Sequence, residues 1–116
     1  MFLFRTVILS VLICFINCSK PHLLKWNKLT TIRENSSIPL TCVSDSGRES
    51  FKFEWFKNNE KITKQSFPKI SITAIDSYSV LNLKNIKIFD AGEYSCHVEN
   101  SDGSDSTTTI LQVQGL

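Results

Sequence analysis

The sequence predicts an all-β domain built as a sandwich of two antiparallel sheets, and three observations carry that prediction. Cys42 and Cys96 are 54 positions apart, Trp55 follows the first of them by 13 positions, and Tyr94 precedes the second by two. Short segments of alternating apolar and polar residues, separated by polar turns, fill most of the chain, and no apolar periodicity of helical length follows residue 19. In a sandwich with this frame we expect the two cysteines on facing sheets, with the tryptophan packed against them.

The size and charge of the chain limit what it can be. Its 116 residues suffice for one domain and are too few for two. The formal net charge is +2, and it falls to +1 when Arg5, in a segment expected to be removed, is set aside. Such a balance gives no electrostatic reason to expect a nucleic acid or an anionic membrane surface as the ligand.

Residues 1–19 have the pattern of a secretory signal peptide. Arg5 precedes an apolar run from Val7 to Ile16, and the small or polar residues Asn17, Cys18 and Ser19 follow. The run is shorter than the ~20 residues that span a membrane, although an uncleaved signal anchor is the alternative. Cleavage after Cys18 or after Ser19 fits the pattern. We set the boundaries at 1–19 for the signal and 20–116 for the domain. We expect a secreted, extracellular product with no membrane insertion by the mature segment, at the cell surface if the full protein has a membrane span.

The four cysteines fall into two groups. Cys14 and Cys18 lie in the expected signal, which leaves Cys42 and Cys96 for the domain. A single pair behind an export signal predicts one structural disulfide formed in an oxidising compartment. Two free buried thiols in a cytosolic domain are the alternative.

Eight segments are expected to form strands. Proline within a central strand removes a ladder hydrogen bond, so we expect a local irregularity at Pro39. Trp55, Leu81 and Tyr94 are expected in the core, with Ile86 filling the corner before residue 92. The expected strands are residues 21–31 (an irregular edge strand), 37–43, 51–57, 61–64, a segment marked by Ile70 and Ile72, 80–83, 92–100 and 105–113.

One charged pair is expected to support the corner before the last two strands. Asp90 precedes Tyr94 by four positions, where a carboxylate would be poorly solvated. A cation near the start of the strand at residues 70–72 could neutralise it, and Lys69 is the candidate.

The strand at residues 51–57 offers a candidate interface on its outer face. Phe53 and Trp55 alternate inward, so Phe56 should point outward with Lys52 and Glu54, near His97 of the expected strand 92–100. Amphipathic faces with an aromatic anchor often form interfaces. Burial of Phe56 beneath a neighbouring strand is the alternative. The edges of the first and last strands offer a second route, through β-pairing with another chain.

Other chemical sites are few. Asn35-Ser36-Ser37 is an N-glycosylation sequon in a predicted turn, with an unmodified polar turn as the alternative. His22 and His97 lack a third ligand at metal spacing, and Asp102 and Asp105 lack the bidentate acid of a calcium loop. No nucleophile stands in a catalytic motif. We expect no metal, no cofactor and no enzymatic activity.

Short motifs recur along the expected strands: Leu40-x-Cys42, Trp55-x-Lys57, Leu81-x-Leu83, Asp90-Ala91-Gly92-Glu93-Tyr94-x-Cys96, Asn100-x-x-Gly103 and Leu111-x-Val113. Through these motifs the chain resembles the I-set branch of the immunoglobulin superfamily across residues 21–113. More narrowly, Phe53-x-Trp55 and Ser79-Val80-Leu81 are similar to an N-terminal domain of the Down syndrome cell adhesion molecule-type receptors of invertebrates. The resemblance implies adhesion through binding between immunoglobulin domains of the same or another protein, within a larger receptor. A soluble secreted single-domain binder, as an immune recognition factor or decoy, and a purely structural spacer are the alternatives.

Overall fold

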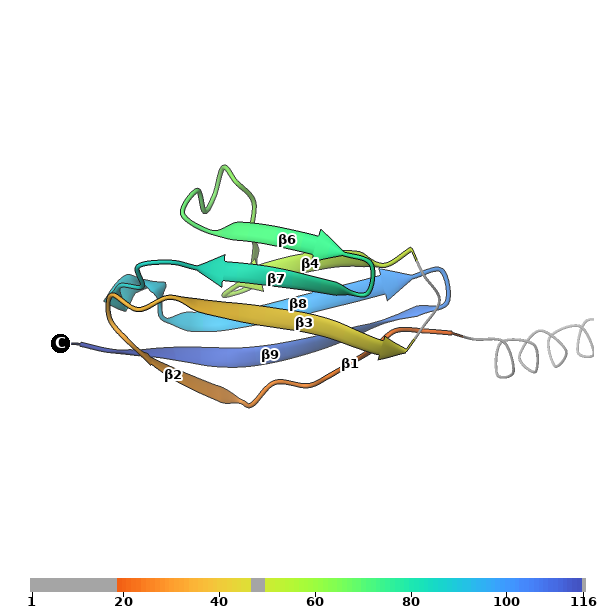
Figure 1. Ribbon diagram of the computed structural model, residues 1–116, viewed down its shortest axis with the longest axis horizontal. Coiled ribbons are helices and arrows are strands. Elements are labelled where there is room, and N and C mark those ends of the chain that lie inside the picture. The colour runs from red at the N-terminus through yellow and green to blue at the C-terminus, as the bar shows by residue number, and fades with distance from the viewer. Residues whose placement is uncertain (1–18, 47–49, 116) are drawn as a thin grey trace, which may run out of the picture.

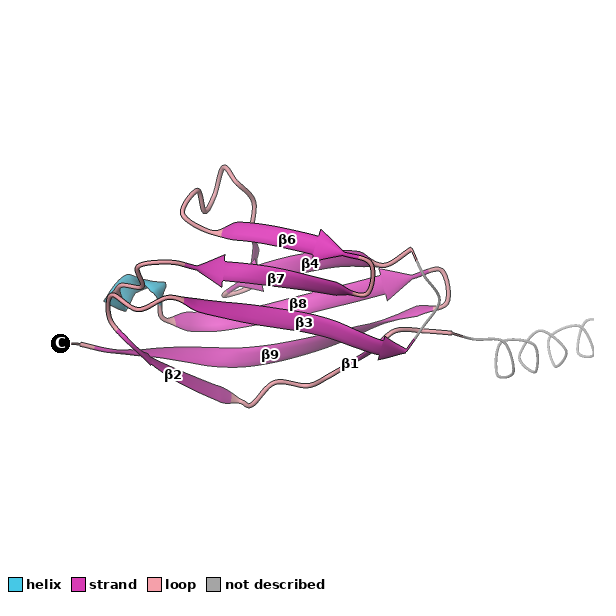
Figure 2. Cartoon of the chain, in the orientation of Figure 1, coloured by secondary structure: helices cyan, strands magenta, loops and turns pink. Residues whose placement is uncertain are grey.

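Nearly all of the described chain is extended. The computed structural model describes residues 19–46 and 50–115, so the expected signal peptide lies outside the described residues except for Ser19. Figure 2 shows strands joined by short loops, with one short 3₁₀ helix, η1 (Ile88–Asp90), before the last two strands. The strands are β1 (His22–Leu23), β2 (Leu29–Arg33), β3 (Ile38–Ser46), β4 (Lys52–Lys57), β5 (Glu60–Lys61), β6 (Ser71–Ile75), β7 (Tyr78–Leu83), β8 (Gly92–Asn100) and β9 (Gly103–Gln114).

The strands form two sheets packed face to face (Figure 1). One sheet has the order β1-β3-β7-β6 and the other has the order β2-β9-β8-β4-β5. Pairing is antiparallel throughout the described residues except between β2 and β9, which run parallel. The predicted all-β sandwich is confirmed.

The core lies between the sheets around the disulfide. Cys42 and Cys96 are bonded with an S–S distance of 2.06 Å and a Cα–Cα distance of 6.3 Å, which confirms the predicted inter-sheet bridge. Trp55 belongs to the same buried cluster, and its Nε1 donates to Ser79 Oγ at 2.9 Å. Trp26 stacks on it with ring centroids 5.6 Å apart. Leu81 and Tyr94 are fully buried, as is Ile86 at the corner.

The N-terminal segment departs from the prediction of one edge strand at residues 21–31. It divides into two short strands on opposite sheets, β1 beside β3 and β2 beside β9. Trp26 stabilises the crossing, because its backbone N–H donates to Thr107 Oγ1 and its Nε1 donates to the Thr41 carbonyl. Since β2 pairs with β9 from Ile110 to Gln114, the edge of the last strand is not free there, contrary to the expected route for β-pairing.

The irregularity expected at Pro39 does not occur. Pro39 lies opposite Asn82 in an unbroken register between β3 and β7. On the other side of β3, β1 pairs only with Ser44 and Ser46. Among the described residues, no strand pairs with Pro39 on that side, and a proline is tolerated where one side of a strand is unpaired. Smaller differences concern boundaries: the expected strand at 61–64 is β5 (Glu60–Lys61), and β9 begins at Gly103.

Candidate protein-binding face

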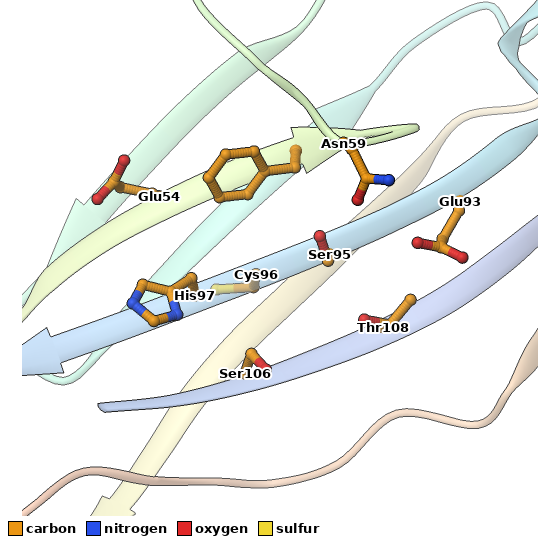
Figure 3. A pocket seen from close by; sticks show the side chains of 9 residues that line it. Glu54, Asn59, Glu93, Ser95, Cys96, His97, Ser106 and Thr108 are labelled. Carbon is orange, nitrogen blue, oxygen red and sulfur yellow. The ribbon is translucent and has the colours of Figure 1, made fainter. Parts of the chain in front are cut away.

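The outer face of the five-stranded sheet gathers the predicted interface residues, and strand alternation puts them there. Trp55 of β4 is buried, so its neighbours Glu54 and Phe56 point to the other side of the sheet. On β8, His97 lies opposite Glu54 and Ser95 lies opposite Phe56. Figure 3 shows Glu54, Ser95 and His97 on one side of these strands. We call this surface of β4, β8 and β9 the outer C–F–G face, because these three strands are lettered C, F and G in sandwiches of this kind.

Charges of both signs alternate on the outer C–F–G face. Glu54 lies between two lysines, with its carboxylate 3.2 Å from Lys61 Nζ and 3.8 Å from Lys52 Nζ. Lys52 Nζ is also 4.0 Å from Glu99. Hydrogen bonding to the Lys61 ammonium lowers the pKa of Glu54, against a smaller opposing effect of desolvation. The lysines of these pairs are more than half exposed and Glu54 is partly exposed, so the pairs contribute little to stability and remain available to a partner.

Phe56 is the aromatic centre of this face. It is half-buried, because β5 pairs beside it at Lys61 without covering it completely. It lines a shallow, open hollow of about 520 Å³ (Figure 3), whose other walls are mostly polar. An open hollow with one aromatic ring and a polar rim suits a protein surface better than a small molecule, which needs an enclosed apolar pocket. The hollow is lined by Glu54, Phe56, Asn59, Glu93, Ser95, Cys96, His97, Ser106 and Thr108.

The corner between β7 and β8, which leads into one strand of this face, is held by a set of polar contacts. The structure puts Lys69 Nζ 2.5 Å from Asp90 Oδ2, the arrangement that the sequence suggested. The same carboxylate oxygen accepts the backbone N–H of Lys87 at 2.7 Å. Tyr94 Oη donates to the Asp90 carbonyl at 2.6 Å, and burial, with a further contribution from the Asp90 charge, raises the pKa of the phenol. We call this set of contacts the Asp90 corner.

A second contact, which sequence reasoning missed, ties β4 to the start of β8. Asn58 Oδ1 accepts the backbone N–H of Glu93 at 2.9 Å. Gly92 passes so close that a Cβ there would lie 2.9 Å from the Asn58 side chain, and its φ of +151° also requires glycine. The available signal was Asn58-Asn59, which the sequence identified only as a turn. Asn58 with a φ of 49° ends β4 and also caps the neighbouring strand.

The other predicted residues lie apart from this face. Asn35 is exposed in a turn with a φ of 69°, and its Oδ1 accepts a hydrogen bond from Lys87 Nζ. Its glycosylation stays a prediction. His22 Nδ1 lies 3.0 Å from Asp45 Oδ1. Within residues 19–46 and 50–115, no group of three acidic, histidine or cysteine side chains could hold a metal ion. The same residues contain no helix long and apolar enough to cross a membrane.

Comparison with known sequences identifies relatives of one part of larger proteins. The chain is 34% identical over 89 residues to the membrane-bound isoform of chicken (Gallus gallus) pro-neuregulin-1. The match covers 75% of this chain and 15% of the relative, so the chain spans about a seventh of that protein's length.

Comparison with solved structures gives the same fold. The I-band fragment I67–I69 of titin matches with a TM-score of 0.71 at 25% identity, covering 83% of this chain and 33% of the titin chain. The Dscam1 Ig7 domain, isoform 5, matches with a TM-score of 0.74 at 22% identity, covering 84% of this chain and 99% of that domain, a likeness of fold alone. The family model for the immunoglobulin I-set domain matches residues 21–113. The chain belongs to the immunoglobulin I-set domain family.

Proposed function

We propose that this protein is an extracellular recognition module for cell adhesion, and that it binds another immunoglobulin domain through the outer C–F–G face. The observation that carries the proposal is Phe56, a half-buried aromatic ring in an open hollow bordered by charges of both signs. Aromatic anchors surrounded by polar rims are typical of protein interfaces, and domains of this family typically bind rather than catalyse.

The charge pattern favours a second copy of the chain as the first partner to test. Lys52 and Lys61 flank Glu54, and Glu93 borders the same hollow. A two-fold axis through such a face would bring lysines of one copy against carboxylates of the other. A different immunoglobulin domain with a similar pattern would satisfy the same chemistry.

Three observations support an extracellular place for the domain. The Cys42–Cys96 disulfide suits an oxidising compartment, and residues 1–19 have the pattern of an export signal. The chicken relative is named as a membrane-bound isoform, and this chain matches about 15% of it. By analogy, we place the domain in a larger membrane-bound protein, which we propose is an adhesion receptor. A soluble single-domain binder is the alternative, and the mass of the native, deglycosylated protein separates the two. A receptor would be far heavier than the 13.2 kDa of this sequence.

Aggregation of beads coated with the secreted protein tests the proposed face. Phe56→Asp puts a negative charge at the centre of the hollow, beside Glu54 and Glu93. We expect wild-type beads to aggregate and Phe56→Asp beads to lose at least tenfold in aggregation, because the anchor is removed and like charges repel. The matched control is Ile75→Asp, which adds the same charge to an exposed apolar position on β6 of the opposite sheet.

The outcomes separate the alternatives. Loss of aggregation in Phe56→Asp alone, at an unchanged melting temperature, supports the outer C–F–G face. Equal loss in Ile75→Asp would move the interface to the opposite sheet. Wild-type beads that do not aggregate would contradict self-binding, and beads coated with other immunoglobulin domains would then be tested in the same way.

A further inference from the structure

Residues Ser19–Pro21 are part of the folded domain. They lie along the turn between β8 and β9, at the end of the sandwich opposite the C-terminus (Figure 1). Asn100 Nδ2 donates to the Ser19 carbonyl at 2.8 Å, and the Ser19 backbone nitrogen donates to Asp102 Oδ2 at 3.2 Å. Pro21 is fully buried. Ser19, which the sequence analysis assigned to the signal, therefore contacts the folded domain.

The turn is shaped to receive this segment. Asn100 Oδ1 accepts the backbone N–H groups of Asp102 and Gly103 at 2.9 and 3.1 Å, which fixes its amide nitrogen toward Ser19. Lys20 passes so close to the turn that a Cβ at Gly103 would lie 2.9 Å from the Lys20 Cβ. Glycine at 103 thus allows the close approach. Contacts from three turn residues converge on a segment that sequence reasoning assigned partly to the leader.

We propose that the leader is removed by hydrolysis of the peptide bond between Cys18 and Ser19, and that the new α-ammonium group of Ser19 pairs with Asp102. The inference rests on the proposed export of the protein, since the protease would be a signal peptidase of the secretory pathway. Water adds across the bond: Cys18 leaves with a carboxylate, and the Ser19 nitrogen becomes a cation with three N–H donors.

Two considerations favour cleavage of this peptide bond over cleavage of the bond before it or the bond after it. Cleavage one residue later would remove Ser19, and with it the carbonyl that Asn100 binds and the nitrogen that Asp102 binds. Cleavage one residue earlier would leave Cys18 on the mature protein as an unpaired thiol, because Cys42 and Cys96 bond to each other. Cleavage between Cys18 and Ser19 keeps both contacts, and it replaces a neutral amide donor to the Asp102 carboxylate by an ammonium donor, which makes the contact an ion pair.

The N-terminal residue of the secreted protein tests the cleavage directly. The full 116-residue chain is expressed in a secreting animal cell line, and the medium is analysed by intact mass and N-terminal sequencing. We expect a single species that begins at Ser19. A protein that begins at Lys20, or that retains Cys18, overturns the inference while leaving export intact. A chain retained inside the cell overturns the proposed export as well, so the two failures are distinguishable.

Periodate tests the pairing with Asp102, because it oxidises an N-terminal serine to an aldehyde and removes its amine. The secreted protein has no methionine once Met1 is lost, which limits side reactions, and any Asn35 glycan is removed first. We expect oxidation to lower the melting temperature of the wild type by about 2–4 °C. In Asp102→Asn, the same oxidation should have no further effect. Glu99→Gln, an exposed acid on the same hairpin, serves as the control and should respond like the wild type. An equal response in all three proteins would overturn the pairing.

Discussion

The Asp90 corner and the outer C–F–G face both contain a lysine–carboxylate pair, but the two pairs differ in burial and in role. Each is organised by a lysine beside a carboxylate, at 2.5 Å for Lys69 and Asp90 and at 3.2 Å for Lys61 and Glu54. The side chains of Lys69 and Asp90 are 35% and 9% exposed, whereas those of Lys61 and Glu54 are 56% and 21% exposed. Burial makes the first pair part of the fold, whereas exposure leaves the second free to change partners.

The surroundings of the two carboxylates explain this difference. Asp90 also accepts the Lys87 backbone N–H, and Lys69 also donates to the Asn85 carbonyl at 3.0 Å. Removing the Asp90 carboxylate takes the acceptor from the Lys87 N–H and the counter-ion from Lys69, which is costly. Glu54 and its lysines would be solvated by water instead. Substitutions at the corner should therefore change stability, and substitutions on the face should change binding.

Asp90→Ala is expected to give the largest effect. It removes the acceptor of the Lys87 N–H and the counter-ion of Lys69, and we expect a loss of about 2–4 kcal/mol in the free energy of unfolding, measured in urea. Asp90→Asn separates the two contributions, because its amide oxygen can still accept from Lys87 but carries no charge. A loss below 1 kcal/mol in Asp90→Ala would show that the corner does not support the fold.

Tyr94→Phe should have a smaller effect at the same corner. The ring remains buried, and only the hydrogen bond from Tyr94 Oη to the Asp90 carbonyl is lost. We expect a loss of about 1–2 kcal/mol, by the same urea measurement. Tyr78→Phe, at a partly exposed tyrosine on β7, is the matched control and should change stability by less than about 0.5 kcal/mol. Equal losses in both variants would mean that the corner hydrogen bond contributes nothing of its own.

The two regions also differ in how far the sequence could predict them. Cysteine, tryptophan and tyrosine at their spacings predict the disulfide, the core and the position of Asp90, because one family of folds imposes those distances. Lys69 could be suggested because a buried carboxylate requires a cation nearby. The division of the N-terminal segment into β1 and β2 could not be predicted, since Trp26 makes its contacts with residues far along the chain.

Contacts that involve backbone groups could not be predicted from the sequence either. Asn58 and Asn100 lie in segments that composition identifies only as turns, yet each binds a backbone group of another strand or segment. The register of the hairpins decides those contacts, and residue types alone do not reveal the register.

On the outer C–F–G face, alternation predicts which side chains point outward, as it did for Phe56 and Glu54. Alternation does not predict that Lys61 of β5 approaches Glu54 as closely as it does.

Glu54→Gln should have the smallest effect on stability and a clear effect on binding. Because contact with Lys61 lowers the pKa of Glu54 in the folded state, its contribution to stability is present above the unperturbed value of 4.5 and is lost as the pH falls below it. The melting temperatures of wild type and variant should differ by no more than about 1 °C at pH 7 and should converge as the pH is lowered. Bead aggregation at pH 7 should fall severalfold, because the two lysines lose the carboxylate between them. A large drop in melting temperature without loss of aggregation would assign Glu54 to the fold and place the binding surface elsewhere.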